Sequence, residues 1–203
     1  MILIRHGQTI FNVVFSVTRV DPGVPDPLLT ALGRRQAREI AAALAGEGIE
    51  RVLASPYRRA IQTADTVARA LGVPMTVDPD VCERFSFSCD VGTRRSDLAR
   101  TWPEYDFGRL DEIWWPASEE SEASFEERCA RFARRMTDDP ARPRTAVITH
   151  WGVIRALTGE RVTNGTLVRL PAADVSRETP ASTCTPRPAV LDAARAGRGE
   201  ADG

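Results

Sequence analysis

Near its amino terminus the chain reads Ile2-Leu3-Ile4-Arg5-His6-Gly7-Gln8-Thr9, an apolar run that ends in an arginine and a histidine. The only other histidine ends a second apolar run, Ala146-Val147-Ile148-Thr149-His150. Runs of this length are typical of buried strands. Because open α/β sheets bind ligands at the carboxyl ends of their strands, we expect His6 and His150 to meet at that edge. Two imidazoles there, one beside an arginine, favour phosphoryl chemistry over packing.

The composition is ordinary for one soluble globular domain. The 203 residues are 42% hydrophobic and 27% charged, and the net charge of −1 gives no general attraction to nucleic acid or to a membrane surface. No apolar run approaches the ~20 residues that cross a bilayer. We therefore expect a cytoplasmic protein without a secretory leader that binds neither nucleic acid nor membranes. The sequence leaves the oligomeric state open.

Several kinds of chemistry lack the residues they need. All 27 basic residues are arginine, so the chain offers no lysine for a Schiff base or a P-loop. The four cysteines show no CxxC spacing, and the two histidines have no third metal ligand at a suitable spacing. These patterns favour reduced thiols and a reaction that uses neither a metal ion nor another cofactor.

Short apolar runs alternate with helical patterns, which predicts βαβ units and a mainly parallel sheet. The predicted strands cover residues 2–5, 52–54, 75–78, 145–149 and 165–170. The predicted helices run from the N-cap Thr30 to Gly46, from the N-cap Ser55 with Pro56 as first helical residue to Gly72, and over 122–137 and 152–159. The resulting fold class is α/β.

Two regions depart from this alternation. Residues of about 80–121 show no clean periodicity and collect aromatic side chains, so we expect an excursion of the chain over the sheet edge rather than a second domain. Beyond Pro171 the chain is rich in Pro, Ala and Arg and poor in apolar residues. We therefore predict one domain over residues 1–170 and a disordered or loosely packed tail over 171–203.

The predicted strand ends bring four side chains together. If strands 2–5, 52–54 and 145–149 are parallel neighbours, then one pocket contains Arg5, His6, Arg58 and His150. Arginine suits an anion there because its planar fork bonds phosphate oxygens in pairs and keeps its charge. Helices that start after two of these strands add backbone N–H groups. The neighbouring Arg59 is expected to be an exposed helix residue.

Five segments, in chain order, resemble the motifs of the histidine phosphatase (phosphoglycerate mutase-like) superfamily. They are Arg5-His6-Gly7-Gln8-Thr9 with Asn12; Asp26-Pro27-Leu28-Leu29-Thr30-Ala31-Leu32-Gly33 with Gln36-Ala37; Ser55-Pro56-Tyr57-Arg58-Arg59-Ala60 with Gln62-Thr63-Ala64; Glu83; and Thr149-His150 with Gly152-Val153-Ile154-Arg155. The resemblance spans roughly residues 2–170. It implies a three-layer αβα sandwich with a mainly parallel central sheet, in which the excursion lies over the active site.

The resemblance also implies a metal-independent phosphomonoester hydrolase without a cofactor. His6 would attack phosphorus and become a transient phosphohistidine. Glu83 would protonate the leaving oxygen and then activate water. The phosphoryl oxygens would be held by Arg5, Arg58 and His150. Further substrate contacts are expected from Gln8, Thr9, Asn12 and Trp151, although the Trp151 ring could instead point away into packing.

The substrate class expected from this resemblance is a small phosphorylated metabolite. A phosphoglycerate-type mutase, a phosphoprotein phosphatase and a non-catalytic protein that binds a phosphorylated ligand stay open as alternatives. Residues 84–118 lack the glycine-rich stretch that the family places after its acid, so the region where substrate choice lies gives no further indication. A solvated loop carboxylate is the competing interpretation of Glu83.

Overall fold

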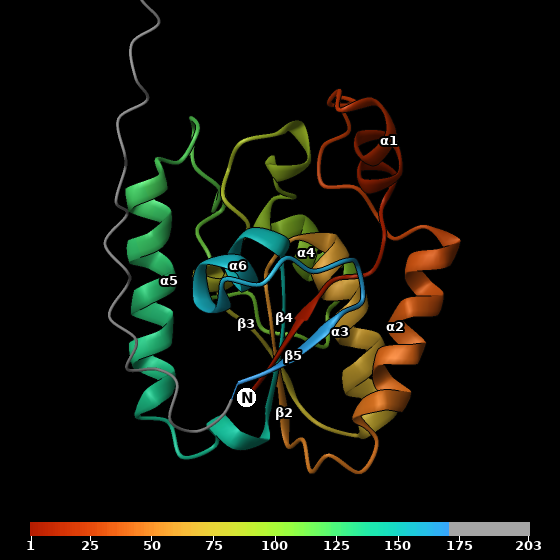
Figure 1. Ribbon diagram of the computed structural model, residues 1–203, viewed down its shortest axis with the longest axis vertical. Coiled ribbons are helices and arrows are strands. Elements are labelled where there is room, and N and C mark those ends of the chain that lie inside the picture. The colour runs from red at the N-terminus through yellow and green to blue at the C-terminus, as the bar shows by residue number, and fades with distance from the viewer. Residues whose placement is uncertain (171–203) are drawn as a thin grey trace, which may run out of the picture.

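The computed structural model describes residues 1–170, and the tail predicted for 171–203 lies outside the described residues. Five strands form one sheet in the order β3-β2-β4-β1-β5 (Figure 1). They are β1 (Ile2–Arg5), β2 (Arg51–Ala54), β3 (Met75–Val77), β4 (Thr145–Thr149) and β5 (Leu167–Arg169). The first four are parallel, and β5 runs antiparallel to β1 at the sheet edge.

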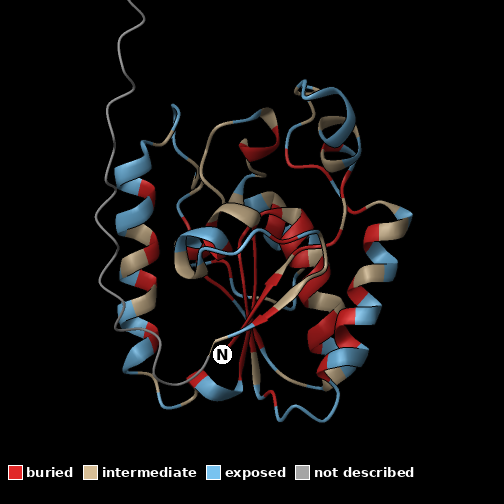
Figure 2. Cartoon of the chain, viewed as in Figure 1, coloured by how far each residue is buried: buried red, intermediate tan, exposed pale blue. Residues whose placement is uncertain are grey.

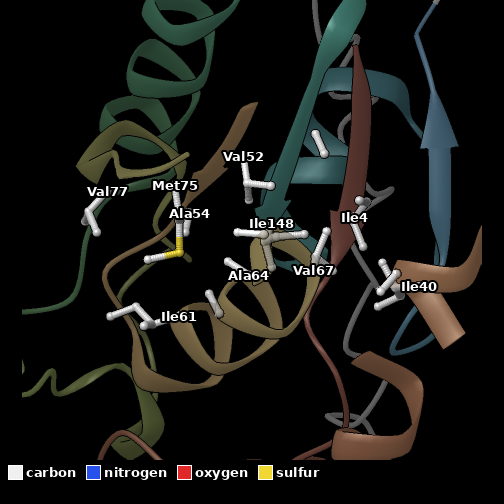
Figure 3. Close-up of a cluster of buried hydrophobic side chains, with 14 of the residues drawn as sticks. Ile4, Ile40, Val52, Ala54, Ile61, Ala64, Val67, Met75, Val77 and Ile148 are labelled. Carbon is white, nitrogen blue, oxygen red and sulfur yellow. The ribbon is translucent and has the colours of Figure 1, made fainter. Parts of the chain in front are cut away.

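Helices cover both faces of the sheet, which confirms the α/β fold class and the three layers. One face carries α2 (Ala31–Leu44) and α3 (Arg58–Leu71), and the other carries α5 (Glu122–Thr137) and α6 (Trp151–Thr158) (Figure 1). Successive strand residues point to opposite faces, so β1, β2 and β4 each contribute to two apolar clusters. Figure 2 shows that the strands of the sheet are largely buried. In β1, Ile4 joins the cluster under α2 and α3 (Figure 3), whereas Leu3 joins the one under α5 and α6.

Most of the remaining elements lie at or near the carboxyl edge of the sheet. Helix α1 (Ile10–Thr18) follows β1, and the excursion contains the turns η1 (Pro79–Val81) and η2 (Ser88–Asp90) and helix α4 (Arg95–Thr101). A third turn, η3 (Arg142–Arg144), leads into β4. In Figure 1, α1 and most of the excursion rise above the same end of the sheet. Within residues 1–170, no helix combines the length and the apolar content that a membrane span requires.

The predicted start of α3 is wrong by two residues. The helix begins at Arg58 after Tyr57, not at Pro56 after a Ser55 cap. Ser55 instead continues β2, because its backbone N–H donates to the carbonyl of Ile148 at 3.0 Å. Helices α1 and α4 were not predicted. Thr9 caps α1 through a reciprocal capping box with Asn12.

The loop after β1 is pressed against the start of α2. The N-cap Thr30 donates its backbone N–H to the carbonyl of Gln8 at 2.9 Å. A β-carbon added to Gly33 would lie 2.1 Å from that same carbonyl oxygen, and one added to Gly7 would lie 2.4 Å from the carbonyl oxygen of Gly33. Both positions therefore require glycine, and the close approach fixes the loop that carries His6.

The close approach predicts a large stability loss for Gly33→Ala. The added methyl must displace backbone atoms, so we expect the free energy of unfolding to fall by about 1–3 kcal/mol. Gly108→Ala is the matched control, since its β-carbon would meet only the flexible side chain of Asp106, at 3.0 Å, and should change stability by less than about 0.5 kcal/mol. Urea denaturation measures both, and equal effects would contradict the packing argument.

Candidate active site

The two histidines meet at the carboxyl edge of the sheet, as expected from the sequence. His6 follows β1 and His150 follows β4, and the two strands pair in parallel with Arg5 opposite Thr149. The ladder continues one step further, because the His6 backbone N–H donates to the carbonyl of Thr149 at 3.0 Å. The ring centroids lie 5.0 Å apart at an angle of 61°. Both side chains are buried.

His6 is held in one tautomer. Its Nδ1 lies 2.7 Å from the carbonyl oxygen of Gly7. A carbonyl only accepts, so Nδ1 carries the proton and the neutral ring keeps its lone pair on Nε2. Burial lowers the pKa of His6 well below its ordinary value, and the charges of Arg59 and Arg5 lower it further. The result is a neutral imidazole with a free Nε2, which is the form that acts as a nucleophile.

His150 has one partnered nitrogen. Its Nε2 lies 2.8 Å from Ser55 Oγ, whereas its buried Nδ1 has no hydrogen-bond partner within residues 1–170. The ring of Tyr57 meets it edge to face, with 5.3 Å between centroids. Burial lowers the pKa of His150 well below its ordinary value, and the charge of Arg59 lowers it further. A buried nitrogen without a partner is costly, so His150 is poised to bond a polar ligand atom.

Arg5 is the first of two arginines beside the imidazoles. Its Nη1 donates to the carbonyl of Val162 at 2.7 Å. Its buried Nε has no hydrogen-bond partner within residues 1–170. Since the charge of Arg5 contributes to the lowered pKa of both His6 and His150, the guanidinium lies within electrostatic reach of the two rings.

Arg58 is not the second arginine at the imidazoles. Its guanidinium donates to the carbonyl of Asp26 from Nε at 2.9 Å and from Nη2 at 2.5 Å, and its side chain is 32% exposed. Arg59, which the sequence placed on the exposed face of the helix, is 3% exposed, so that expectation is wrong. Its charge is the largest electrostatic contribution to the lowered pKa of both His6 and His150.

The orientation of Arg59 follows from the phase of α3. Arg59 lies one turn before Thr63, whose hydroxyl accepts the backbone N–H of Gly7 at 3.2 Å. This face of α3 therefore looks toward the loop of His6, while the next face, with Arg58, looks toward Asp26. Arg59 lies two helical turns before the buried Val67, so the two residues share one face of α3. This spacing is the signal in the sequence that could have identified Arg59 as a buried residue.

Glu83 lies against the start of α6 and is not a solvated loop carboxylate. Its Oε2 accepts the backbone N–H of Gly152 at 3.1 Å, and its Oε1 accepts that of Arg84 at 3.0 Å. A β-carbon on Gly152 would lie 2.2 Å from Oε1, so a larger residue there would displace the carboxyl group. Burial raises the pKa of Glu83, and the charge of Asp90 raises it further. A raised pKa favours the protonated form that a general acid requires.

The other expected contacts divide into two groups. The side-chain oxygen of Asn12 accepts from Thr9 and, at 3.2 Å, from Asn164, whose amide also donates to the carbonyl of His6 at 3.1 Å. Asn12 and Thr9 therefore belong to the support of the His6 loop, together with Asn164, which the sequence did not indicate. Gln8 instead bonds away from the imidazoles, since its side-chain oxygen accepts from the hydroxyl of Thr30 at 3.0 Å.

Trp151 is placed by packing. Its ring packs against the apolar cluster on the α5 side of the sheet, and the guanidinium of Arg155 lies over it, 5.2 Å from the ring centroid. Of the two orientations left open by the sequence, the structure has the one in which the ring points into packing.

The site as a whole presents positive charge and unpartnered polar atoms to a small volume. Arg5 and Arg59 supply permanent charge, and the imidazoles are neutral. No three His, Cys, Asp or Glu side chains of residues 1–170 are grouped so as to hold a metal ion. Such an arrangement suits an anion with several oxygens, and it offers an unprotonated imidazole nitrogen and a carboxyl group with a raised pKa.

The lowered pKa values predict how stability depends on pH. An unfolded histidine binds its proton near pH 6.5, whereas the folded imidazoles do so only at lower pH. The unfolded state therefore binds more protons in that window, and the free energy of unfolding should fall as the pH drops below 6.5, by up to about 1.4 kcal/mol per pH unit for each histidine. Imidazole NMR titration of the folded and urea-unfolded protein checks this, and a folded ring that titrates at or above pH 6.5 contradicts it.

Comparisons with known proteins agree with this geometry. The profile of the histidine phosphatase superfamily (branch 1) matches residues 1–177. "Phosphoglycerate mutase-like protein 4" of Arabidopsis thaliana is 31% identical over 163 residues, which cover 77% of this chain and 68% of that protein. "Probable phosphoglycerate mutase GpmB" of Yersinia enterocolitica is 37% identical over 81 residues, 40% of this chain, so the match spans only 36% of that relative.

A solved structure shows the same architecture. The mycobacterial glucosyl-3-phosphoglycerate phosphatase is 26% identical with a TM-score of 0.53, and the match covers 78% of this chain and 77% of that one. The sheet, the two strand-end histidines and the matched length together identify the family. The chain belongs to the histidine phosphatase superfamily (branch 1).

Proposed function

We propose that the protein is a phosphomonoester hydrolase that works through a phosphohistidine on His6 and acts on a small phosphorylated molecule. The observation that carries the proposal is the state of His6. It is a buried, neutral imidazole with Nδ1 bonded to the carbonyl of Gly7 and Nε2 unprotonated, beside Arg5 and Arg59. Nearby cations do not stabilise a neutral imidazole in the folded structure. They do favour the attack of a nucleophilic nitrogen on an anionic phosphoryl group.

The reaction has two balanced steps. His6 Nε2 forms a bond to phosphorus while the ester P–O bond breaks, and the leaving oxygen takes the proton of Glu83. Water then attacks the phosphohistidine, Glu83 takes a proton from that water, and the N–P bond breaks to release phosphate. Arg5, Arg59 and His150 stabilise the charge on the phosphoryl oxygens in both steps. Arg59 takes the role that the sequence assigned to Arg58.

A mutase is the second candidate, because the relatives from Arabidopsis and Yersinia carry that activity in their names. It shares the first step and differs in the second, where a hydroxyl of the bound intermediate replaces water. A single-turnover experiment with phosphorylated enzyme separates the two. Release of inorganic phosphate supports the hydrolase, and transfer to an added phosphoglycerate supports the mutase.

The first test is hydrolysis of p-nitrophenyl phosphate in the presence of EDTA by the wild type and by His6→Ala. We expect turnover that survives EDTA and falls on the order of 10³-fold or more in the variant, because no other group supplies the nucleophile. Thermal unfolding of both proteins controls for folding. If a folded His6→Ala retains activity, His6 is not the nucleophile. If EDTA abolishes the activity of the wild type, the reaction depends on a metal ion.

The adjacent arginines give a matched pair of variants. Arg59→Lys keeps the charge but loses the planar fork, and we expect kcat/KM to fall about 10²- to 10³-fold. Arg58→Lys should cost less than about 10-fold, since its guanidinium is bonded to Asp26 rather than turned toward the imidazoles. Steady-state kinetics on p-nitrophenyl phosphate measure both effects. A larger loss in Arg58→Lys would restore the assignment made from the sequence.

A further inference from the structure

Asp90 is a buried carboxylate that the proposed reaction does not use. It ends the turn η2 of the excursion and is 1% exposed. Its Oδ1 lies 3.0 Å from Arg59 Nη2, and the carbonyl of the preceding Cys89 accepts from Arg59 Nη1 at 2.7 Å. The turn therefore binds both terminal nitrogens of one guanidinium, which fixes the plane of the fork as well as its position.

The carboxylate of Asp90 is itself held firmly. Its second oxygen, Oδ2, accepts the backbone N–H groups of Ser86 at 3.2 Å and Phe87 at 3.1 Å. The carbonyl of Asp90 accepts the hydroxyl of Tyr57 at 2.7 Å, and the Tyr57 ring lies 4.2 Å from the guanidinium carbon of Arg59. The turn and the first residues of α3 are thus joined by bonds on both sides of Arg59.

These contacts leave Arg59 free to bind a ligand. A guanidinium has five N–H donors, and the turn takes two of them, so three remain. The other nearby carboxylate belongs to Asp26, and its Oδ1 lies 3.9 Å from Arg59 Nη1, beyond hydrogen-bond distance. Arg59 is therefore balanced in charge by two buried carboxylates and still has donors for phosphoryl oxygens.

We propose that Asp90 is a positioning residue of the phosphoryl-transfer site, which orients the Arg59 guanidinium through Oδ1. The proposal rests on the proposed function and adds to it a link between the excursion and the catalytic groups. Asp90 touches no reacting atom and acts through Arg59. The excursion then contributes a residue that orients a side chain of the site, in addition to lying over the site.

The charge of Asp90 also affects the proton on Glu83. The charged and titratable groups around Glu83 are Asp90, Arg59, Arg5, the thiols of Cys89 and Cys129, and Arg128, whose guanidinium donates to the carbonyl of Glu83 at 3.4 Å. After burial, the charge of Asp90 is the largest cause of the raised pKa of Glu83, and Arg59 acts in the opposite direction. Asp90 therefore helps to keep the general acid protonated while its ion pair with Arg59 keeps the nearby cation in place.

The test is Asp90→Asn, which keeps the size of the side chain and removes its charge. We expect inorganic phosphate, titrated calorimetrically, to bind about 10- to 100-fold more weakly, because Arg59 loses a charge-assisted partner. With ethyl phosphate, whose leaving group needs the acid, the alkaline limb of kcat/KM should move to lower pH, since Glu83 without its anionic neighbour releases its proton earlier. With p-nitrophenyl phosphate the limb should stay in place.

Asp139→Asn is the matched control, because it removes a carboxylate that pairs with Arg51 at the opposite end of the sheet. It should leave both the phosphate affinity and the pH profile unchanged. A folded Asp90→Asn with wild-type phosphate affinity overturns the proposal, whether or not the limb moves. So does a loss of turnover that is equal for both esters and is accompanied by neither change, since that pattern is expected of a purely structural residue.

Two further arms keep the test decisive. If Asp90→Asn does not fold, Asp90→Glu keeps the charge and should leave the alkaline limb in place while lowering kcat, and an unchanged kcat overturns the positioning role. If the wild type hydrolyses no phosphomonoester, the proposed function fails by itself. The phosphate titration still decides whether Asp90 orients Arg59.

Discussion

The parallel pairing of β1 with β4 is the constraint on which the site depends. The register that sets Arg5 opposite Thr149 makes a histidine the next residue of each strand, and the backbone of His6 extends the ladder by one bond. Neighbouring strands lie about 4.8 Å apart, so the two rings have to be neighbours. Both strands are buried inside the sheet, so the two imidazoles follow backbone that is packed on both faces.

Burial and the neighbouring charges then set the protonation states of the groups at this edge of the sheet. Burial and the nearby arginines keep both imidazoles neutral, and burial with the charge of Asp90 favours the protonated form of Glu83. The same low-dielectric surroundings leave Arg5 Nε and His150 Nδ1 without partners within residues 1–170. Groups arranged in this way are unfavourable alone and favourable around an anion, which is the preorganisation that phosphoryl transfer requires.

The different surroundings of Arg58 and Arg59 have a simple physical origin. Each residue of a helix turns the side chain by about 100°, so two adjacent arginines face different neighbours. The sequence pattern locates α3 but not its phase, because the Ser-Pro pair resembles a helix start although Ser55 still pairs with β4. Tertiary contacts decide the outcome. The carbonyl of Asp26 takes Arg58, and the turn at Asp90 takes Arg59.

By itself the sequence determined the strands, the main helices and the meeting of His6, His150 and Arg5, since these follow from local periodicity and from the edge at which parallel strands end. Only the tertiary structure decided the contacts of Arg59, Asp90 and Asn164 and the packing of Trp151 against the apolar cluster on the α5 side. Their contacts join segments that are from about thirty to more than 150 residues apart in the chain, or depend on which face of a helix meets the core. Periodicity says where a side chain is buried, and only the packed fold says which group lies beside it.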